Sequence, residues 1–316
     1  MPTGFAYVQI RNEICVPDRL GIEPWGVSAV THSDGSAIAR RRKVAASLRH
    51  LRDEAGRTEY EAAEHLDCPP TRFQQIEAGM VAVRLTEVRS LLDLYNTGHE
   101  QREEILGEAQ RARDRCWWYP YADLIDDTFE TQLILEDDAA VLRTYQPNLV
   151  PGLLQTEHYA WELIETQSDL PLDTVRRLAK LRTLRQQVLS RDDAPRLDVI
   201  LDEAVLRRPV GSPAVMREQY RRLAEIAAGP RVTIRVLPFE AGPHQALGAG
   251  FHIFEFKGSE SAMVELELLD RVTFVMESRE VGRYTEIFEQ VRKQALDAEQ
   301  SRALLSGLAM TAEEAP

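Results

Sequence analysis

The chain has few cysteines, no long apolar segment and, at its N-terminus, no pattern of the kind expected for a secretion signal. Its 316 residues include three cysteines, Cys15, Cys68 and Cys116, which lie far apart and form neither a CxxC pair nor a Cys/His ligand spacing. Neither a disulfide framework nor a structural zinc site is therefore expected, and a reducing cytoplasm is the expected location. No apolar run approaches the ~20 residues of a membrane span, and the N-terminus lacks a basic segment followed by an apolar one. Neither membrane insertion nor secretion is expected.

Basic residues are also fewer than acidic ones. The chain has 38 Lys and Arg against 51 Asp and Glu, a formal net charge of -13. A polyanion is repelled by such an average, so any prediction of DNA binding must rest on local charge. Between Ser36 and Arg84 there are nine basic and seven acidic residues, a local balance of +2. The excess of acid lies elsewhere in the chain.

The periodicity of apolar residues predicts two domains joined by a short linker. Residues 1–36 show no sustained period and are predicted to be a flexible arm. Residues 37–118 carry five short helical patterns, and residues 129–309 alternate helical patterns with β-like runs. The segment 119–128 is predicted to be the linker, and 310–316 a tail. The expected fold is an all-α head followed by a mixed α/β domain.

The head contains a helix, a proline turn and a second helix in close succession. Thr58 and Glu61 form a capping box that opens the first of these helices, and Pro69 and Pro70 interrupt the chain before the next one. A helix-turn-helix needs a small residue in the first helix, an apolar residue before the turn and an apolar anchor in the second helix. The sequence supplies these as Ala63, Leu66, Phe73 and Ile76.

This spacing, together with Ile76-Glu77-Ala78-Gly79, resembles the Xre/Cro repressor family, whose domains have the lambda-repressor fold. The resemblance implies that Pro70, Thr71 and Gln75 face the bases, with Arg72 and Gln74 nearer the DNA backbone. Gln75 can offer a donor and an acceptor to the edge of adenine, Thr71 can meet a hydroxyl acceptor or a thymine methyl group, and Arg72 can reach phosphate or guanine. The basic stretch at the start of the head would supply further charge: Arg40, Arg41, Arg42 and Lys43.

A plain helical bundle is the alternative interpretation of the same residues, with Gln74-Gln75 and the basic stretch as solvated faces. Two departures from the family pattern bear on DNA binding. Glu59 stands where the family usually has a phosphate-contacting glutamine, and Pro69-Pro70 replaces the usual Ser or Thr cap and its polar neighbour. A carboxylate beside phosphate is repulsive, so binding is expected to be weak or to depend on a dimer.

The second domain is expected to contain helices near residues 129–145, 156–166, 172–190, 214–228 and 281–308. Between them lie the β-like runs LDVILD, VTIRVLP, GFHIFEF, AMVELEL and VTFVM. VTIRVLP is nearly continuous in apolar and β-branched residues, which is typical of a central strand. The stretch Tyr145 to Ile164, YQPNLVPGLLQTEHYAWELI, resembles the opening of a domain of unknown function in actinobacterial Xre-family regulators of the WhiJ type. That resemblance implies a transcriptional regulator, often paired with a small protein encoded nearby.

The acidic and histidine residues of the second domain are the candidates for catalysis. Carboxylates at strand ends beside a histidine can do acid/base chemistry. Asp202-Glu203, however, is typical of a helix cap, and Glu265 and Glu267 alternate as one solvated strand face. We therefore predict no catalytic residue, no cofactor and no metal site. A flexible glycine loop between two strands commonly edges a cleft, which predicts a ligand or partner pocket. Its residues would be Asp202, Glu203, His244 and Gln245.

The sequence thus predicts a cytoplasmic, sequence-specific DNA-binding regulator that acts as a homodimer on double-stranded DNA. Its second domain would sense a ligand or bind a small partner protein, and it would supply the dimer contact. Two other classes remain open. One is an antitoxin-like adaptor whose helix-turn-helix no longer binds DNA, which Glu59 and the net charge favour. The other is an enzyme that uses the cleft of the second domain.

Overall fold

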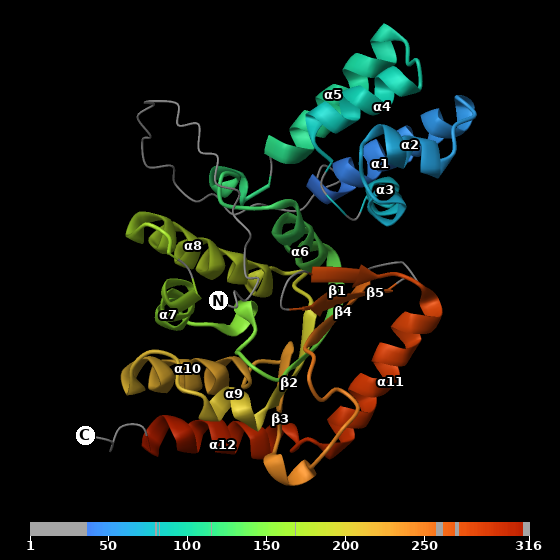
Figure 1. Ribbon diagram of the computed structural model, residues 1–316. Coiled ribbons are helices and arrows are strands. Elements are labelled where there is room, and N and C mark those ends of the chain that lie inside the picture. Colours follow the sequence, from blue (N-terminus) through green and yellow to red (C-terminus); the bar gives the residue numbers. More distant parts are fainter. Residues whose placement is uncertain are drawn as a thin grey trace. The chain divides into compact units, whose positions relative to one another are not determined.

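The computed structural model describes residues 37–311, apart from 80, 82, 115, 168, 257–261 and 269–271. The predicted arm, residues 1–36, and the end of the predicted tail, residues 312–316, lie outside the described residues. The described chain forms two compact units that divide between Ile134 and Leu135 (Figure 1). No helix in the described ranges combines the length and the apolar character that a bilayer crossing requires.

The first unit begins with five helices, as predicted. Thr58 caps the second helix: its hydroxyl accepts a hydrogen bond from the backbone N–H of Glu61, and the Glu61 carboxylate accepts one from the N–H of Thr58. A short 3-10 turn, Tyr119–Tyr121, precedes a sixth helix, α6. The bounds are Ala37–Glu54 for α1, Glu59–His65 for α2, Pro70–Glu77 for α3, Leu85–Leu94 for α4, His99–Asp114 for α5 and Asp127–Asp138 for α6.

One apolar core holds the five helices together. Leu48 of α1, Phe73 of α3 and Leu91 of α4 are fully buried in it. Ala63 of α2 is 1% exposed, and its small side chain lets α2 approach α3 closely. Burying a large apolar side chain contributes about 1.5–3 kcal/mol, so this core accounts for most of the stability that short helices lack on their own.

The second unit is built on a six-stranded mixed sheet in the order β3-β2-β1-β4-β5-β6. β1, β2 and β3 run parallel to one another, whereas β4, β5 and β6 pair in antiparallel fashion. All five predicted strands are present. The bounds are Ala139–Gln146 for β1, Arg196–Asp202 for β2, Val232–Leu237 for β3, Phe251–Phe256 for β4, Ala262–Glu267 for β5 and Val272–Val275 for β6.

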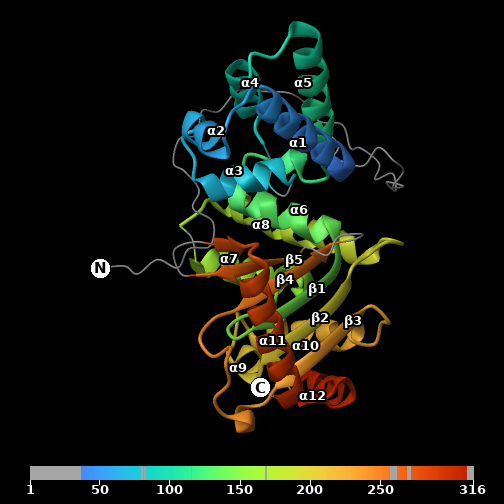
Figure 2. The ribbon, with the colours of Figure 1, turned by 90° about the vertical axis from the view of Figure 1, so that its right-hand side faces the viewer.

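Helices cover both faces of this sheet (Figures 1 and 2). On one face Phe288 of α11 packs with Tyr145, Ile253 and Val264. On the other face lie α7, α8 and α10, seen behind the sheet in Figure 2. The bounds are Glu157–Gln167 for α7, Leu172–Arg185 for α8, Glu203–Arg207 for α9, Pro213–Ile226 for α10, Ser278–Gln294 for α11 and Ala298–Thr311 for α12.

Two predictions about the second domain were wrong. The segment 139–145, predicted to continue a helix, is the strand β1, because it pairs with both β2 and β4 and this pairing outweighs its local helical pattern. VTIRVLP is the end strand β3 and not a central one. The outer backbone groups of Val236 in β3 are nevertheless satisfied. Its N–H donates to Ser301 Oγ at 2.9 Å, and its carbonyl accepts from Leu296 N at 2.9 Å.

Candidate functional site

The turn between α2 and α3 has the geometry of a helix-turn-helix. The N–H of Cys68 donates to the carbonyl of Ala63, and Asp67 takes a positive φ of 51° to reverse the chain. Pro69 occupies the N-cap of α3 and Pro70 its first position, where the missing N–H costs no intrahelical hydrogen bond. The proline pair therefore starts α3 without the side-chain cap that the family usually has.

The Ile76-Glu77-Ala78-Gly79 pattern has a structural explanation. The Glu77 carboxylate receives two hydrogen bonds from Arg52 of α1, at 2.8 and 2.9 Å, and both side chains are buried. Gly79 has a φ of 70°, and a Cβ there would lie 3.2 Å from the Cα of Arg42. Ile76 is 1% exposed in the core. These residues lock the end of α3 against α1, so the pattern fixes the orientation of the helix.

The exposed face of α3 carries Thr71, Gln74 and Ala78, with Pro70 exposed at its start. The prediction that Gln75 faces outward was wrong, because its side chain is 8% exposed and therefore buried. Thr71, Gln74 and Ala78 follow one another at i, i+3 and i+7, which is the spacing of one helix face. Gln74, expected nearer the DNA backbone, thus takes the outward position that had been assigned to Gln75.

Carboxylates lie against the polar groups of this face. Gln74 Nε2 donates to Glu59 Oε2 at 2.8 Å, so the acidic departure from the family pattern holds one hydrogen of the exposed amide. Arg72 contacts Glu87 at 2.8 Å and Asp127, the first residue of α6, at 3.6 Å. Arg84 donates to both oxygens of the same Asp127, each at 2.8 Å. Phosphate would have to replace Asp127 at these arginines.

Only part of the basic stretch at the start of α1 is exposed and available to contact DNA phosphates. Arg41 was expected to supply charge at the surface, but it is 7% exposed and its Nη2 lies 3.6 Å from Cys116 Sγ. Its position on the apolar side of α1 turns it towards α5. Arg42 and Lys43 are exposed, and Lys43 contacts Glu108 at 3.2 Å. The side chain of Arg40 lies outside the described residues.

The predicted cleft of the second domain is in part a buried polar cluster. The side chain of His244 is 2% exposed, and its Nε2 lies 3.3 Å from the Tyr145 hydroxyl and 3.9 Å from Asp202 Oδ2. Burial and the Asp202 carboxylate raise the pKa of Tyr145. The structure thus brings Asp202 and His244 together, and it adds Tyr145, which the sequence reading had not considered as a polar residue.

The other two predicted cleft residues lie elsewhere. Glu203 accepts hydrogen bonds from Arg207 and from the backbone N–H of Phe239, so it ties α9 to the turn that follows β3. Gln245 is exposed. Asp202 also caps α9, because its Oδ1 accepts from the N–H of Ala204 at 2.9 Å. These contacts support a structural role for the pair Asp202-Glu203.

A second buried polar cluster lies on the sheet face opposite α11. His252 of β4 is paired in register with Glu265 of β5, and Glu267 follows two residues later. The prediction that Glu265 is solvated was wrong, since it is 1% exposed. Burial raises the pKa of Glu265 to about 8. Burial opposes charge on His252, but a hydrogen bond to Glu267 and the nearby carboxylates outweigh it and raise its pKa.

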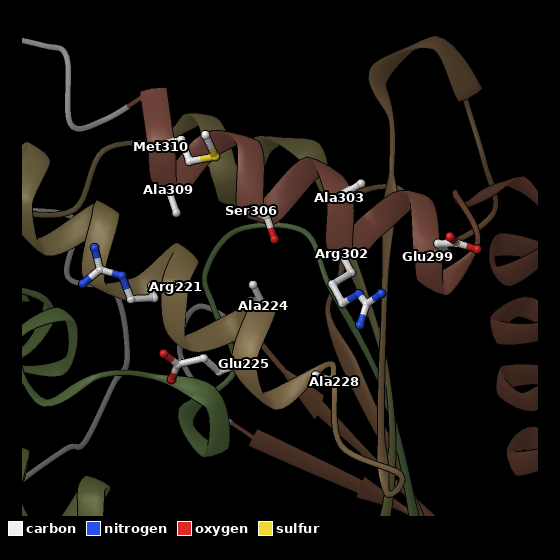
Figure 3. Close-up of a pocket in the computed structure, with 10 residues that line it drawn as sticks. All are labelled: Arg221, Ala224, Glu225, Ala228, Glu299, Arg302, Ala303, Ser306, Ala309 and Met310. Carbon is white, nitrogen blue, oxygen red and sulfur yellow. The ribbon is translucent and has the colours of Figure 1, made fainter.

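A groove of about 590 Å³ runs between α10 and α12 (Figure 3). Small side chains are among the residues that line it, including Ala224, Ala228 and Ala303. Side chains of both charges line it as well, and Figure 3 shows them on both helices: Arg221, Glu225, Glu299 and Arg302. The sequence reading had no sign of this groove, because its residues come from segments more than 70 positions apart.

Comparison with known protein families agrees with this architecture. Residues 43–105 match a family model described as a helix-turn-helix domain, which makes DNA the implied partner of the head. Residues 129–307 match a model described as a domain of unknown function (DUF5753), and this match covers more than half of the chain. No curated protein and no solved structure gives a significant match. The resemblance drawn from the sequence is therefore confirmed at the level of the two domains, and the chain belongs to the DUF5753 family, with a helix-turn-helix domain preceding the family domain.

Proposed function

We propose that the protein is a sequence-specific DNA-binding transcriptional regulator that reads bases through Thr71 and Gln74 of α3. The observation that carries this proposal is the exposed face of α3, whose orientation is fixed by Phe73, Ile76 and the Arg52–Glu77 pair. A glutamine amide offers a donor and an acceptor to the edge of adenine, and a threonine contacts a thymine methyl group or a phosphate. A side chain on a rigidly held helix can make such contacts with defined geometry.

Nearby cations supply the contacts to phosphate. Arg42 and Lys43 are exposed on α1, and Arg72 and Arg84 lie beside the exposed face of α3. Arg72 and Arg84 hold Asp127, whose side chain is 46% exposed, so the contact is readily exchanged for a phosphate oxygen. Binding then begins with the loss of a weak internal ion pair, and we expect it to be strongest at low salt.

The test is a titration against duplexes. A preferred duplex is first selected from a random pool with the purified full chain, and its affinity is compared with that of a scrambled duplex. Gln74→Ala should cost about 1–3 kcal/mol on the selected duplex and change little on the scrambled one. Gln101→Ala, an exposed glutamine on α5, is the matched control. Equal losses on both duplexes would remove Gln74 from base recognition.

We propose further that two copies associate through the groove between α10 and α12. Small side chains permit close approach of helices, and the acidic and basic side chains around the groove suit a twofold contact in which each copy pairs its acids with the bases of the other. Such a dimer would meet palindromic half-sites about one DNA turn, ~34 Å, apart.

The oligomeric state tests this part of the proposal. Ala303→Glu places a charge at an exposed position that lines the groove and should convert the dimer to a monomer in sedimentation equilibrium, with loss of preference for a palindrome over a half-site. Leu172→Glu, an exposed leucine on α8, is the control for adding one carboxylate to the same domain. A wild-type chain that is monomeric at all concentrations would overturn the dimer.

The adaptor without DNA binding is the second candidate function. The observation that favours it is the presence of Glu59 and Asp127 against Gln74, Arg72 and Arg84. In both candidates the second domain is the part that meets a ligand or a small partner protein. Burial of the Tyr145–Asp202–His244 cluster supports a non-catalytic role for that domain. Failure of the wild type to bind any duplex at low salt would favour the adaptor.

A further inference from the structure

Three potential metal ligands converge on one face of the sheet. His252 lies on β4 directly opposite Glu265 on β5, and Glu267 is two residues further along β5, so the period of a strand places all three on the same face. One ligand atom from each of the three side chains lies within 4.8 Å of the others. His252 Nε2 and Glu267 Oε1 are 3.7 Å apart. The Gln146 amide of β1 lies 3.1 Å from the same imidazole nitrogen.

Two of the three ligands, Glu265 and Glu267, are carboxylates, and they lie near the buried ion pair of Glu136 of α6 and Arg185 of α8. Burying two neighbouring carboxylates is costly unless a cation or a proton compensates them.

Among the described residues, two buried atoms of the cluster have no hydrogen-bond partner. Glu265 is 1% exposed, yet its Oε2 has no hydrogen-bond partner, and the same is true of Nδ1 of His252, which is 5% exposed. Buried polar groups in proteins are nearly always satisfied, so each exception requires an explanation. A proton on Glu265 would neutralise one carboxylate but would leave its second oxygen without a donor. A cation would supply the partner that the second oxygen of Glu265 lacks, with Nε2 of His252, the nitrogen 3.7 Å from Glu267 Oε1, as the imidazole ligand.

We propose that His252, Glu265 and Glu267 bind one divalent transition-metal ion of the class of Zn²⁺ or Mn²⁺. An imidazole nitrogen with two carboxylate oxygens is a ligand set that suits these ions, whereas Mg²⁺ and Ca²⁺ prefer oxygen alone. Ligand atoms around such an ion lie roughly 3–3.5 Å apart, so the 3.7 Å between His252 Nε2 and Glu267 Oε1 needs little change, whereas separations of up to 4.8 Å in the cluster have to close further. Rotation of the Gln146 amide would bring its oxygen to a fourth position.

The ion has a route to this site. The side chain of Glu267 is 23% exposed, whereas that of His252 is 6% exposed, so the cluster opens to solvent on the side of Glu267. A site with one partly exposed ligand and two buried ones can exchange its ion without unfolding of the sheet. The proposal stands on the second domain alone and is independent of DNA binding by the head.

The experiment uses the full chain, freed of any affinity tag and treated with a chelator. Zn²⁺ and Mn²⁺ are titrated separately by calorimetry, with Mg²⁺ and Ca²⁺ as comparison ions, and melting temperatures are recorded with and without each ion. We expect one Zn²⁺ or Mn²⁺ per chain and, at a 100-fold excess of ion over the Kd, a rise in melting temperature of roughly 5–10 °C. Mg²⁺ and Ca²⁺ should bind at least ~100-fold more weakly.

Three variants locate the site. His252→Gln and Glu265→Gln should each weaken binding of the preferred ion by at least ~100-fold and abolish the rise in melting temperature. His158→Gln, which removes an exposed histidine of α7, is the matched control and should bind as the wild type does. Glu267→Gln changes the most exposed of the three ligands, so it keeps the test decisive if a buried variant fails to fold.

Two results would overturn the proposal. One is a wild-type chain that binds neither Zn²⁺ nor Mn²⁺ after treatment with chelator. The other is unchanged stoichiometry and affinity in Glu267→Gln or in a folded His252→Gln, which would place any bound ion elsewhere. Either result is distinct from a failure of the DNA-binding proposal, because neither measurement contains DNA.

Discussion

The two domains each bury a cluster of charged side chains, and the clusters differ in how completely their hydrogen bonds are satisfied. In the head, Arg52 and Glu77 match one to one, with two hydrogen bonds between them. In the second domain, the cluster around His252 is unbalanced, because an oxygen of Glu265 has no hydrogen-bond partner among the described residues. A balanced cluster is explained by the fold alone, since it positions α3 against α1. The unbalanced one is the observation behind the metal site that we propose.

The largest effect is expected from breaking the balanced pair. Arg52→Met leaves the Glu77 carboxylate buried without its partner and should lower the free energy of unfolding of the head by about 3–5 kcal/mol. Urea unfolding of the full chain, followed by circular dichroism, measures this loss. Arg57→Gln removes an arginine from the exposed pair with Glu61 and should cost less than about 0.5 kcal/mol. Similar losses in both variants would show that burial of the pair does not matter.

A double variant sharpens this result. Arg52→Met combined with Glu77→Met replaces both charges by apolar side chains of similar length, so no buried charge is left without a partner. The double variant should be more stable than Arg52→Met alone, because the cost of a broken buried pair lies mainly in the charge that remains. A double variant at least as unstable as the single one would assign the loss to packing.

A substitution in the unbalanced cluster around His252 should change the free energy of unfolding much less than Arg52→Met does. Without metal, Glu265→Gln removes a buried carboxyl group that has acidic neighbours and an unpartnered oxygen. We expect the free energy of unfolding of the second domain to change by no more than about 1 kcal/mol, or to increase. Glu77→Gln, the same chemical change in the balanced pair, should be clearly destabilising. The comparison is made by thermal unfolding in the presence of a chelator.

The smallest effect on stability is expected at an exposed ion pair. Asp127→Asn removes the carboxylate that Arg84 and Arg72 share, leaves Arg72 paired with Glu87, and should change the free energy of unfolding by less than about 1 kcal/mol. Affinity for any duplex should nevertheless rise by about 2- to 5-fold at low salt, because Arg84 becomes available to phosphate and a nearby negative charge is lost. Asp93→Asn, which frees Arg102 on α5, controls for the loss of one negative charge. Equal gains in both variants would indicate a general charge effect.

Local signals in the sequence were reliable where neighbours in the chain decide the outcome. The capping box of Thr58 and Glu61, the proline start of α3 and all five predicted strands depend on short-range chemistry, and each is present. The anchor residues Phe73 and Ile76 were also identified, because core residues of a helix recur with a fixed period.

Predictions failed where distant segments decide the environment of a residue. Glu265 alternates with apolar residues as an exposed strand residue would, but helices cover both faces of this sheet, so alternation does not separate inside from outside. Gln75 and Arg41 are buried although both are polar. Asp127 escaped notice because its partners Arg72 and Arg84 lie more than 40 positions away. No periodicity within one segment contains that information.

The sealed edge of β3 restricts how copies of this protein can join. An uncovered end strand offers a row of backbone donors and acceptors, and a strand from another molecule can extend the sheet there, which is a common start of amyloid-like aggregation. Here Leu296 and Ser301, at the passage from α11 to α12, occupy the outer hydrogen-bonding groups of Val236. Docking of a foreign strand at this point would require α12 to detach from the sheet. The segment between α11 and α12 thus hinders the addition of a foreign strand along β3.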